Sequence, residues 1–168
     1  IHDAFEKIEK SSKPVVAAIN GSALGGGLET ALCCHYRVSS KQGFIGLPEV
    51  NLGLLPGAGG TQRLPRLVGP AEALKIMLSG RHIPAVKAVD MGVIDSLSEG
   101  DIVEDAVAFA KDVAEKNETH PLVRNLNEKV LAARGDENII SEARALAAKT
   151  RKGQFAPGKI IQCCLLYT

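Results

Sequence analysis

The chain of 168 residues contains no tryptophan, and aromatic residues make up only 4% of it. Proteins that bind single strands of nucleic acid stack the bases on aromatic side chains, so binding of this kind is not expected. The formal net charge is only +1 and no basic stripe stands out, which also argues against nucleic acid as a partner. No apolar run approaches the roughly 20 residues of a membrane-spanning helix. With 45% hydrophobic and 23% charged residues, the chain has the composition of one ordinary globular domain.

Motifs for metals, phosphates and nucleophiles are also missing. The four cysteines occur as adjacent pairs at 33–34 and 163–164, a spacing that matches no zinc or redox motif, and the four histidines are scattered. We therefore expect no metal site, and free buried thiols in a reducing compartment. The glycine run at 25–27 is not followed by the Lys-Ser/Thr of a phosphate-binding loop. A nucleophile elbow of the G-x-S-x-G type is absent.

The most informative feature that is present is a pair of glutamates, each just after a turn marked by glycine or proline. Glu29 ends the sequence LGGGLE, and Glu49 ends GLPE. Each has an ordinary explanation alone, because Glu29 suits the first turn of a helix and Glu49 suits a surface loop. Together, with apolar neighbours and glycine N–H groups at a helix start, they indicate acid/base chemistry on an activated acyl group.

Hydrophobic patterning predicts strands that alternate with helices, and then helices only. Residues 14–19 form a continuous apolar run, which predicts a strand buried on both faces. Residues 47–61 are rich in glycine and proline yet apolar, which predicts a buried or ligand-lining loop. Further strands are expected at 36–39, 44–45 and 93–97, and helices at about 1–11, 28–34, 60–67, 70–79, 84–91, 101–116, 121–133, 138–151 and 154–166. This order indicates an α/β core followed by a helical section.

Two segments carry a family resemblance. Residues 13–29, KPVVAAINGSALGGGLE, resemble the signature of the enoyl-CoA hydratase/isomerase (crotonase) family, and residues 47–66, LPEVNLGLLPGAGGTQRLPR, are similar to its second signature. Overall, the chain is most similar to the hydratase part of a peroxisomal or bacterial bifunctional enoyl-CoA hydratase/3-hydroxyacyl-CoA dehydrogenase. The resemblance implies an α/β fold of the ClpP/crotonase type, a spiral of ββα turns. Residues 1–100 would be the C-terminal part of the crotonase core, and residues 101–168 a helical section leading toward a further domain.

The resemblance also implies the residues of a site. It places Glu29 and Glu49 at a catalytic water, with help from the backbone N–H of Gly57, and makes the N–H of Gly26 an oxyanion donor. The substrate contacts that it implies are Leu24, Gly25, Leu28, Leu54 and Pro56. The implied reaction is hydration of trans-2-enoyl-CoA to 3-hydroxyacyl-CoA in fatty-acid β-oxidation. Which glutamate takes the proton from water and which delivers one to the α-carbon stays open, because coupled carboxylates share their titration.

Several alternatives stay open at this point. The presence of both glutamates favours a hydratase, because isomerases of the family usually keep only the second acid. An enoyl-CoA double-bond isomerase and a non-catalytic CoA- or partner-binding role remain alternatives. Acyl-CoA is the expected partner, and no cofactor is expected in this segment, with NAD only if a dehydrogenase domain follows. A homo-oligomer built through the C-terminal helices is one option. The expected location is the peroxisome in a eukaryote or the cytoplasm in a bacterium, and the mitochondrion is a third option.

The residues that resemble the family do not include the N-terminal part of the family's domain. The early strands are missing, as is the loop of the Ser-Ala-Gly-Ala-Asp type that supplies the other oxyanion N–H. The chain starts at Ile1, inside an expected helix, and residues 163–168 do not resemble a continuation toward a dehydrogenase. We therefore expect a partial sequence of a longer enzyme. On its own it would be impaired, because loss of one oxyanion donor costs about 10²–10³ in rate.

Overall fold

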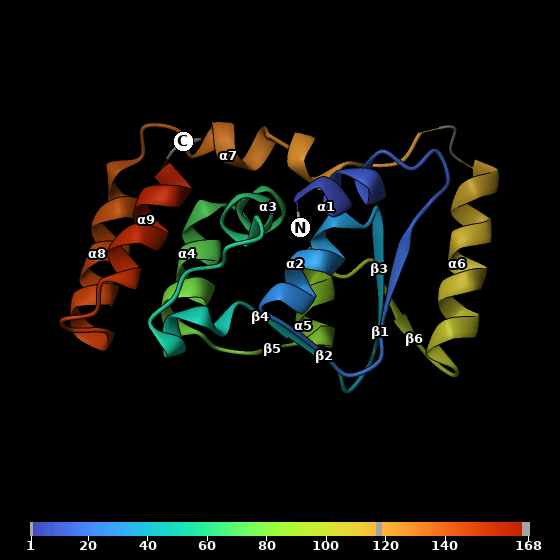
Figure 1. Ribbon diagram of the computed structural model, residues 1–168, viewed down its shortest axis with the longest axis horizontal. Coiled ribbons are helices and arrows are strands. Elements are labelled where there is room, and N and C mark those ends of the chain that lie inside the picture. The colour runs from blue at the N-terminus through green and yellow to red at the C-terminus, as the bar shows by residue number, and fades with distance from the viewer. Residues whose placement is uncertain (1, 117–118, 166–168) are drawn as a thin grey trace.

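Two small β-sheets lie at the centre of the structure, a computed structural model that describes residues 2–116 and 119–165 (Figure 1). Expectations for Ile1 and for residues 166–168 lie outside the described residues. The strands are β1 (Val16–Ile19), β2 (Ser22–Leu24), β3 (Tyr36–Ser40), β4 (Phe44–Gly46), β5 (Ile83–Pro84) and β6 (Ser96–Ser98). The α-helices are α1 (His2–Glu9), α2 (Gly26–Cys33), α3 (Gly60–Val68), α4 (Pro70–Ser79), α5 (Ala85–Asp90), α6 (Ile102–Lys116), α7 (Glu128–Ala132), α8 (Glu137–Thr150) and α9 (Ala156–Leu165). Two 3₁₀ helices are η1 (Pro48–Leu52) and η2 (Val123–Asn125).

The strands follow a repeating path between the two sheets. The first sheet has the order β1-β3-β6 and is parallel throughout, and the second has the order β2-β4-β5, in which only β5 is antiparallel. The chain therefore runs through β1, β2 and α2, and then through β3, β4 and η1, as two successive ββ-helix turns. A side chain at Gly43, in the second turn, would meet the carbonyl oxygen of Gly21, in the first, at 2.6 Å. The two turns are thus stacked in direct contact, as in a spiral.

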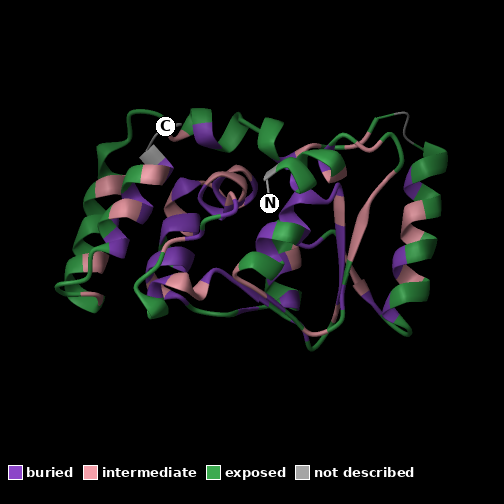
Figure 2. Ribbon diagram, viewed as in Figure 1, coloured by how far each residue is buried: buried purple, intermediate pink, exposed green. Residues whose placement is uncertain are grey.

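Helices cover these sheets in layers along the length of the molecule. Figure 1 shows α6 on the outer side of the first sheet, with α2, α3 and α4 on the other side and α8 and α9 at the far end. Buried residues concentrate in the layers between, and the outer faces of α6 and α8 are exposed (Figure 2). The largest core cluster is aliphatic and includes the fully buried Leu28, Leu32, Leu47 and Leu64. Among the described residues, no helix is long and apolar enough to cross a membrane.

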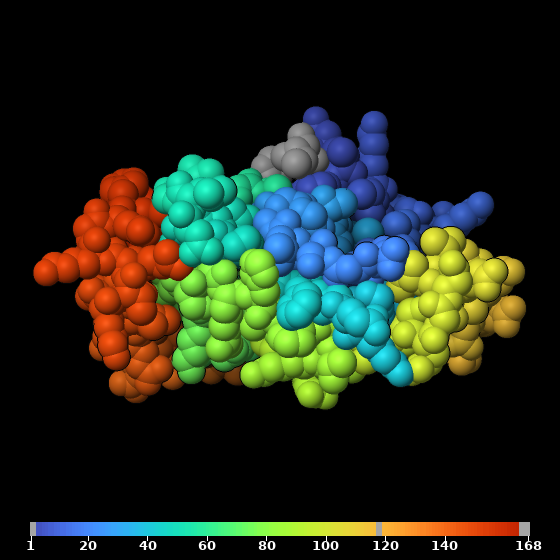
Figure 3. Space-filling model, turned by 90° about the horizontal axis from the view of Figure 1, so that it is seen from below, coloured from blue at the N-terminus to red at the C-terminus, as the bar shows by residue number. Residues whose placement is uncertain are grey.

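The helical section is tied to the core by Arg151, at the C-terminal end of α8. Its guanidinium donates to the carbonyl oxygens of Leu78 (3.2 Å) and Ser79 (2.7 Å), which end α4, and to the amide oxygen of Asn51 (2.5 Å) in η1. The last carbonyls of a helix have no partner within the helix, so such a donor stabilises its end. Figure 3 shows the resulting contact, with the segment around η1 (teal) beside the C-terminal helices (red).

Most of the predicted elements are confirmed, including the helices at 60–67, 70–79 and 138–151. The single helix predicted at 121–133 is wrong, because the chain forms η2 and then α7 there. Asn125 ends η2 and Asn127 precedes α7, and asparagine favours turns over helix interiors.

Two strand predictions need correction. The strand expected at 93–97 lies at 96–98, because the backbone N–H groups of Val93 and Ile94 both donate to the carbonyl oxygen of Ala88 in α5. Strand β1 is not buried on both faces, because Ala18 is exposed and Val16 and Ala17 are only half-buried. The short strands β2 and β5 were not predicted.

Candidate active site

Glu29 is fixed at the start of α2 by a glycine turn. Gly25 has a positive φ of 55°, which favours glycine, and its N–H donates to the carbonyl oxygen of Gly46 on the neighbouring strand (2.9 Å). Helix α2 then begins at Gly26, and the N–H of Glu29 donates back to the carbonyl oxygen of Gly25 (3.0 Å). The side chain of Glu29 therefore lies in the first helical turn, and the residue is only 3% exposed.

The carboxylate of Glu29 is held by the loop that precedes α3. Its Oε1 accepts hydrogen bonds from the backbone N–H of Ala58 (2.7 Å) and of Gly60 (2.8 Å). These two donors were not among the predicted site residues. The N–H of Gly57, predicted to help hold the water, has no hydrogen-bond partner in the described part of the chain. The only available signal was the run of small residues at 57–60, which lets backbone approach a side chain closely.

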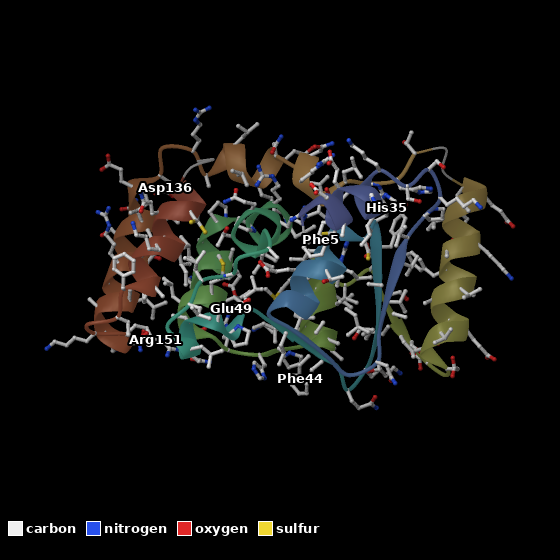
Figure 4. The ribbon with its side chains drawn as sticks, in the orientation of Figure 1. Phe5, His35, Phe44, Glu49, Asp136 and Arg151 are labelled. Atoms are coloured by element: carbon white, nitrogen blue, oxygen red, sulfur yellow. The ribbon has the colours of Figure 1, made fainter. Side chains whose placement is uncertain are left out.

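Glu49 lies in η1, close to the same glycine turn (Figure 4). A side chain at Gly25 would come within 3.2 Å of Glu49 Oε1, so the turn and this carboxyl group are in near contact. The other oxygen, Oε2, is buried and has no hydrogen-bond partner in the part of the chain that the structure describes. Buried polar atoms are nearly always hydrogen-bonded in proteins, so this oxygen is placed to receive or give a proton to a bound molecule.

The two carboxyl groups are close enough to influence each other electrostatically. Burial is the main cause that raises the pKa of Glu49 above its ordinary value, and the negative charge of Glu29 adds to it. A hydrogen bond from the residue's own backbone N–H opposes part of the shift. Glu49 therefore stays protonated to a higher pH than a free glutamate does, which suits a proton donor.

Comparison with known proteins then identifies the family. The family model described as "Enoyl-CoA hydratase/isomerase" matches residues 1–157. The chain belongs to the enoyl-CoA hydratase/isomerase family. The family resemblance of its sequence is thus confirmed, and structures of this family confirm the α/β crotonase-type fold. The enoyl-CoA hydratase from Bacillus anthracis matches with a TM-score of 0.65 and 32% identity, over 89% of this chain and 60% of that chain.

Two relatives are much longer than this chain. The peroxisomal bifunctional enzyme of Pongo abelii is 48% identical over 153 residues, which is 90% of this chain and 21% of that protein. The fatty acid oxidation complex subunit alpha of Shewanella sp. (strain MR-4) is 46% identical over 96% of this chain and 23% of that protein. The chain thus spans roughly a fifth to a quarter of the length of these relatives.

The other predicted site residues of this family member lie in different environments. Gly26 is exposed at the N-terminus of α2, where a helix leaves its first N–H groups without internal partners. Leu24 is half-buried, at the end of β2. Leu28 is fully buried in the core, so it is not on a surface that a ligand could reach. The remaining two differ from each other, because Leu54 is 58% exposed and Pro56 is buried.

Metal chemistry has no candidate site among residues 2–116 and 119–165, where no three His, Cys, Asp or Glu side chains come together to hold an ion. The four cysteines are free thiols, and only Cys163 is not fully buried. Cys33 lies in the same helix as Glu29, four residues further on. Burial raises the pKa of its thiol to about 12, so it is not a nucleophile at neutral pH.

Gly60→Ala is expected to destabilise the family member by about 1–3 kcal/mol, because the added methyl overpacks the site. The new Cβ would lie 3.0 Å from Glu29 Oε1, 2.9 Å from Leu47 Cδ1 and 3.0 Å from Pro56 Cβ. Urea unfolding measures the change. Gly57→Ala is the matched control, since its Cβ meets nothing closer than 4.0 Å, and its effect should stay within about 0.5 kcal/mol. Equal losses in the two variants would contradict the close packing around Glu29.

Glu49→Gln is expected to stabilise the protein at neutral pH but not at acidic pH. A group whose pKa is raised on folding contributes stability below its ordinary value of 4.5 and loses that contribution as pH rises through the raised pKa. Glutamine cannot ionise, so the variant escapes this loss. Urea unfolding of both proteins at about pH 3.5 and at about pH 8 tests this, and a variant that gains no relative stability between the two pH values would refute it.

Proposed function

We propose that this chain carries the acid/base residues of an enzyme that hydrates trans-2-enoyl-CoA to 3-hydroxyacyl-CoA in fatty-acid β-oxidation. The observation that carries the proposal is the pair of glutamates beside one glycine turn. Glu29 is anchored by two backbone N–H groups, and Glu49 presents a buried oxygen without a partner. A water molecule between two such carboxyl groups would have an acceptor on one side and a proton donor on the other. The name of one relative, fatty acid oxidation complex subunit alpha, supports the substrate class.

The proposed reaction assigns a separate part to each glutamate. Glu29, whose Oε1 is occupied by the loop, uses Oε2 to take a proton from water as the water oxygen bonds to the β-carbon. Glu49, with its raised pKa, gives its proton to the α-carbon. The double bond becomes a single bond, and the product gains one hydrogen and one hydroxyl group. The proton on Glu29 then returns to Glu49 through a water before the next cycle, so the pair is restored.

The thioester oxygen needs stabilisation while the α-carbon carries negative charge. In the proposal, the N–H of Gly26 donates to this oxygen, aided by the dipole of α2. The exposed N–H of Gly57 is proposed to help hold the water, as the family resemblance implied. Leu24, Gly25, Leu54 and Pro56 are proposed to contact the acyl-CoA, whereas the burial of Leu28 restricts it to a supporting position behind them.

The partners, cofactors and location of the protein are also proposals. Acyl-CoA is the proposed partner, and this segment is proposed to need no cofactor, with NAD relevant only to a dehydrogenase domain elsewhere in the protein. One relative is named as peroxisomal, which supports a peroxisomal location if the source is a eukaryote. Three further points stay predictions. They are a homo-oligomer through the C-terminal helices, the boundary between segments 1–100 and 101–168, and a cytoplasmic or mitochondrial location.

A double-bond isomerase is the second candidate, because the family's own description covers both activities and one raised-pKa carboxyl group suffices to move a proton. Crotonyl-CoA with the intact protein separates the two. We expect loss of the enoyl-thioester absorbance and formation of the 3-hydroxyacyl product. A folded protein that binds CoA and leaves this absorbance unchanged would exclude the hydratase and favour isomerisation or binding alone.

A further inference from the structure

A buried ion pair lies behind the loop that holds Glu29. Glu9, at the end of α1, has a side chain that is only 2% exposed, and its Oε1 accepts from Nε (3.0 Å) and Nη2 (2.9 Å) of Arg63 in α3. The second oxygen of Glu9 pairs with Arg124 Nη1 at 3.2 Å. The guanidinium carbon of Arg63 also lies 5.9 Å from the ring centre of Phe5, in α1 (Figure 4). Helix α1 thus contacts this guanidinium along one edge, through Glu9, and on one face, through Phe5.

The remaining edge of Arg63 faces the loop. Its Nη1 donates to the carbonyl oxygen of Ala58 at 3.3 Å. That carbonyl belongs to the peptide between Ala58 and Gly59, and the two N–H groups that hold Glu29 belong to the peptides immediately before and after it. A guanidinium is a planar fork that can bind two acceptors in fixed directions at once. Arg63 therefore connects the carboxylate of Glu9 to the one peptide that sets the direction of both donors to Glu29.

Gly59 makes room for this contact. A side chain at this position would meet Arg63 Nη1 at 2.1 Å, far inside normal contact. The residue also has a φ of +103°, a conformation that side chains other than glycine rarely adopt. The loop is thus shaped on one side to receive the carboxylate of Glu29 and on the other to receive the guanidinium of Arg63.

We propose that Arg63, held by Glu9, is a positioning residue that fixes the loop at 58–60 and so orients Glu29 for its part in the reaction. The proposal rests on the hydration proposed above. Arg63 touches neither the glutamate nor the substrate. Its effect passes through one peptide group, so losing it should misplace the base by a small distance while the rest of the site stays in place. Small misplacements of a reacting group reduce the rate of the chemical step much more than they reduce binding.

Arg63→Lys in the intact protein tests the proposal, with crotonyl-CoA as the probe. Lysine keeps the positive charge facing Glu9 but cannot span both Glu9 and the Ala58 carbonyl oxygen. We expect kcat to fall about 10- to 100-fold, with KM changed less than about twofold. We also expect faster hydrogen exchange at the backbone N–H groups of Ala58 and Gly60, because their bonds to Glu29 open more often.

Arg37→Lys is the matched control for general loss of stability. Arg37 is also buried, forms an ion pair with Asp95 (3.0 Å) and donates to the carbonyl oxygens of Cys34 (3.0 Å) and Val93 (2.5 Å). These contacts join β3 to the C-terminal end of α2 and to the segment before β6, and do not involve the loop at 58–60. Its kcat, measured on folded protein, should match that of the unmodified protein. Equal losses of kcat in both lysine variants would overturn the positioning role.

Glu9→Gln provides a second variant in case Arg63→Lys fails to fold. The amide oxygen of glutamine still accepts from Arg63 but lacks the charge, so we expect the same changes in kcat and exchange, at smaller size. Unchanged kcat and unchanged exchange at Ala58 and Gly60 would overturn the proposal. If the unmodified protein does not hydrate crotonyl-CoA, the proposed function fails separately. Hydrogen exchange then tests only whether Arg63 fixes the loop at 58–60. Faster exchange at Ala58 and Gly60 in Arg63→Lys but not in Arg37→Lys would support this role, and any other result would overturn it.

Discussion

Glu29→Gln and Glu49→Gln are each expected to reduce the rate of crotonyl-CoA hydration by about 10²- to 10⁴-fold, the usual contribution of a positioned acid or base. Glutamine at position 29 keeps an oxygen that can accept from Ala58 and Gly60, so the loop should stay in place while the base is lost. Glutamine at position 49 removes the transferable proton. The measurement is kcat from the loss of enoyl-thioester absorbance in the intact protein.

The double variant sharpens this expectation. Residues that act on one water as a unit have strongly non-additive effects, so removing both should cost little more than removing either. Glu72→Gln serves as the control, because Glu72 lies on α4 in an ion pair with Arg81, and its replacement should leave kcat unchanged. If either single variant kept full activity, the part assigned to that glutamate would be wrong. If the losses simply multiplied, the two would not be sharing one water.

Gly26→Pro should reduce kcat by about 10²- to 10³-fold, since proline removes the N–H that is proposed to bind the thioester oxygen. Gly26 is the first residue of α2, the position where a helix accepts proline most readily. A Cβ there would meet no atom within 4 Å outside the adjacent residues and the backbone of its own helix. The preceding residue, Gly25, has no Cβ to collide with the proline ring. The fold is therefore expected to survive the loss of this donor.

Gly26→Ala is the comparison that isolates the N–H. Alanine adds a side chain at the same place but keeps the donor, so it should retain much more of the rate than proline does. Circular dichroism and urea unfolding establish that both variants are folded. Equal rates for the alanine and proline variants would show that the N–H of Gly26 does not stabilise the reacting oxygen, and the donor would have to be sought elsewhere at the start of α2.

The sequence was sufficient to predict the helix starts and the position of Glu29, because local residue patterns determine them. Glycine at 25–27 marked the start of α2, and position in the first turn placed Glu29 at the end that favours an acid. Proline at 70 and at 84 marked the starts of α4 and α5. The turns before Glu29 and Glu49 suggested that the two act together, and the family resemblance implied that they meet at one water.

Contacts between distant residues could not be predicted in this way. The bonds from Glu29 to Ala58 and Gly60 depend on how α3 docks against α2, which no short pattern describes. The ion pair of Glu9 with Arg63 joins residues 54 positions apart, and each alone resembles an ordinary charge on a helix face. Strand β6 begins only at residue 96 for a related reason. The backbone N–H groups of Val93 and Ile94 donate to the carbonyl oxygen of Ala88 in α5 and not to a neighbouring strand.

The central claim is that the Glu29–Glu49 pair adds water to an enoyl-CoA. The most direct test is to let the intact protein react with crotonyl-CoA in water labelled with heavy oxygen and to measure the mass of the product by mass spectrometry. We expect one labelled oxygen on the β-carbon of a 3-hydroxyacyl-CoA, and loss of this product in Glu29→Gln. A product that has the mass of the substrate, with its double bond moved and no label, would contradict hydration by the Glu29–Glu49 pair.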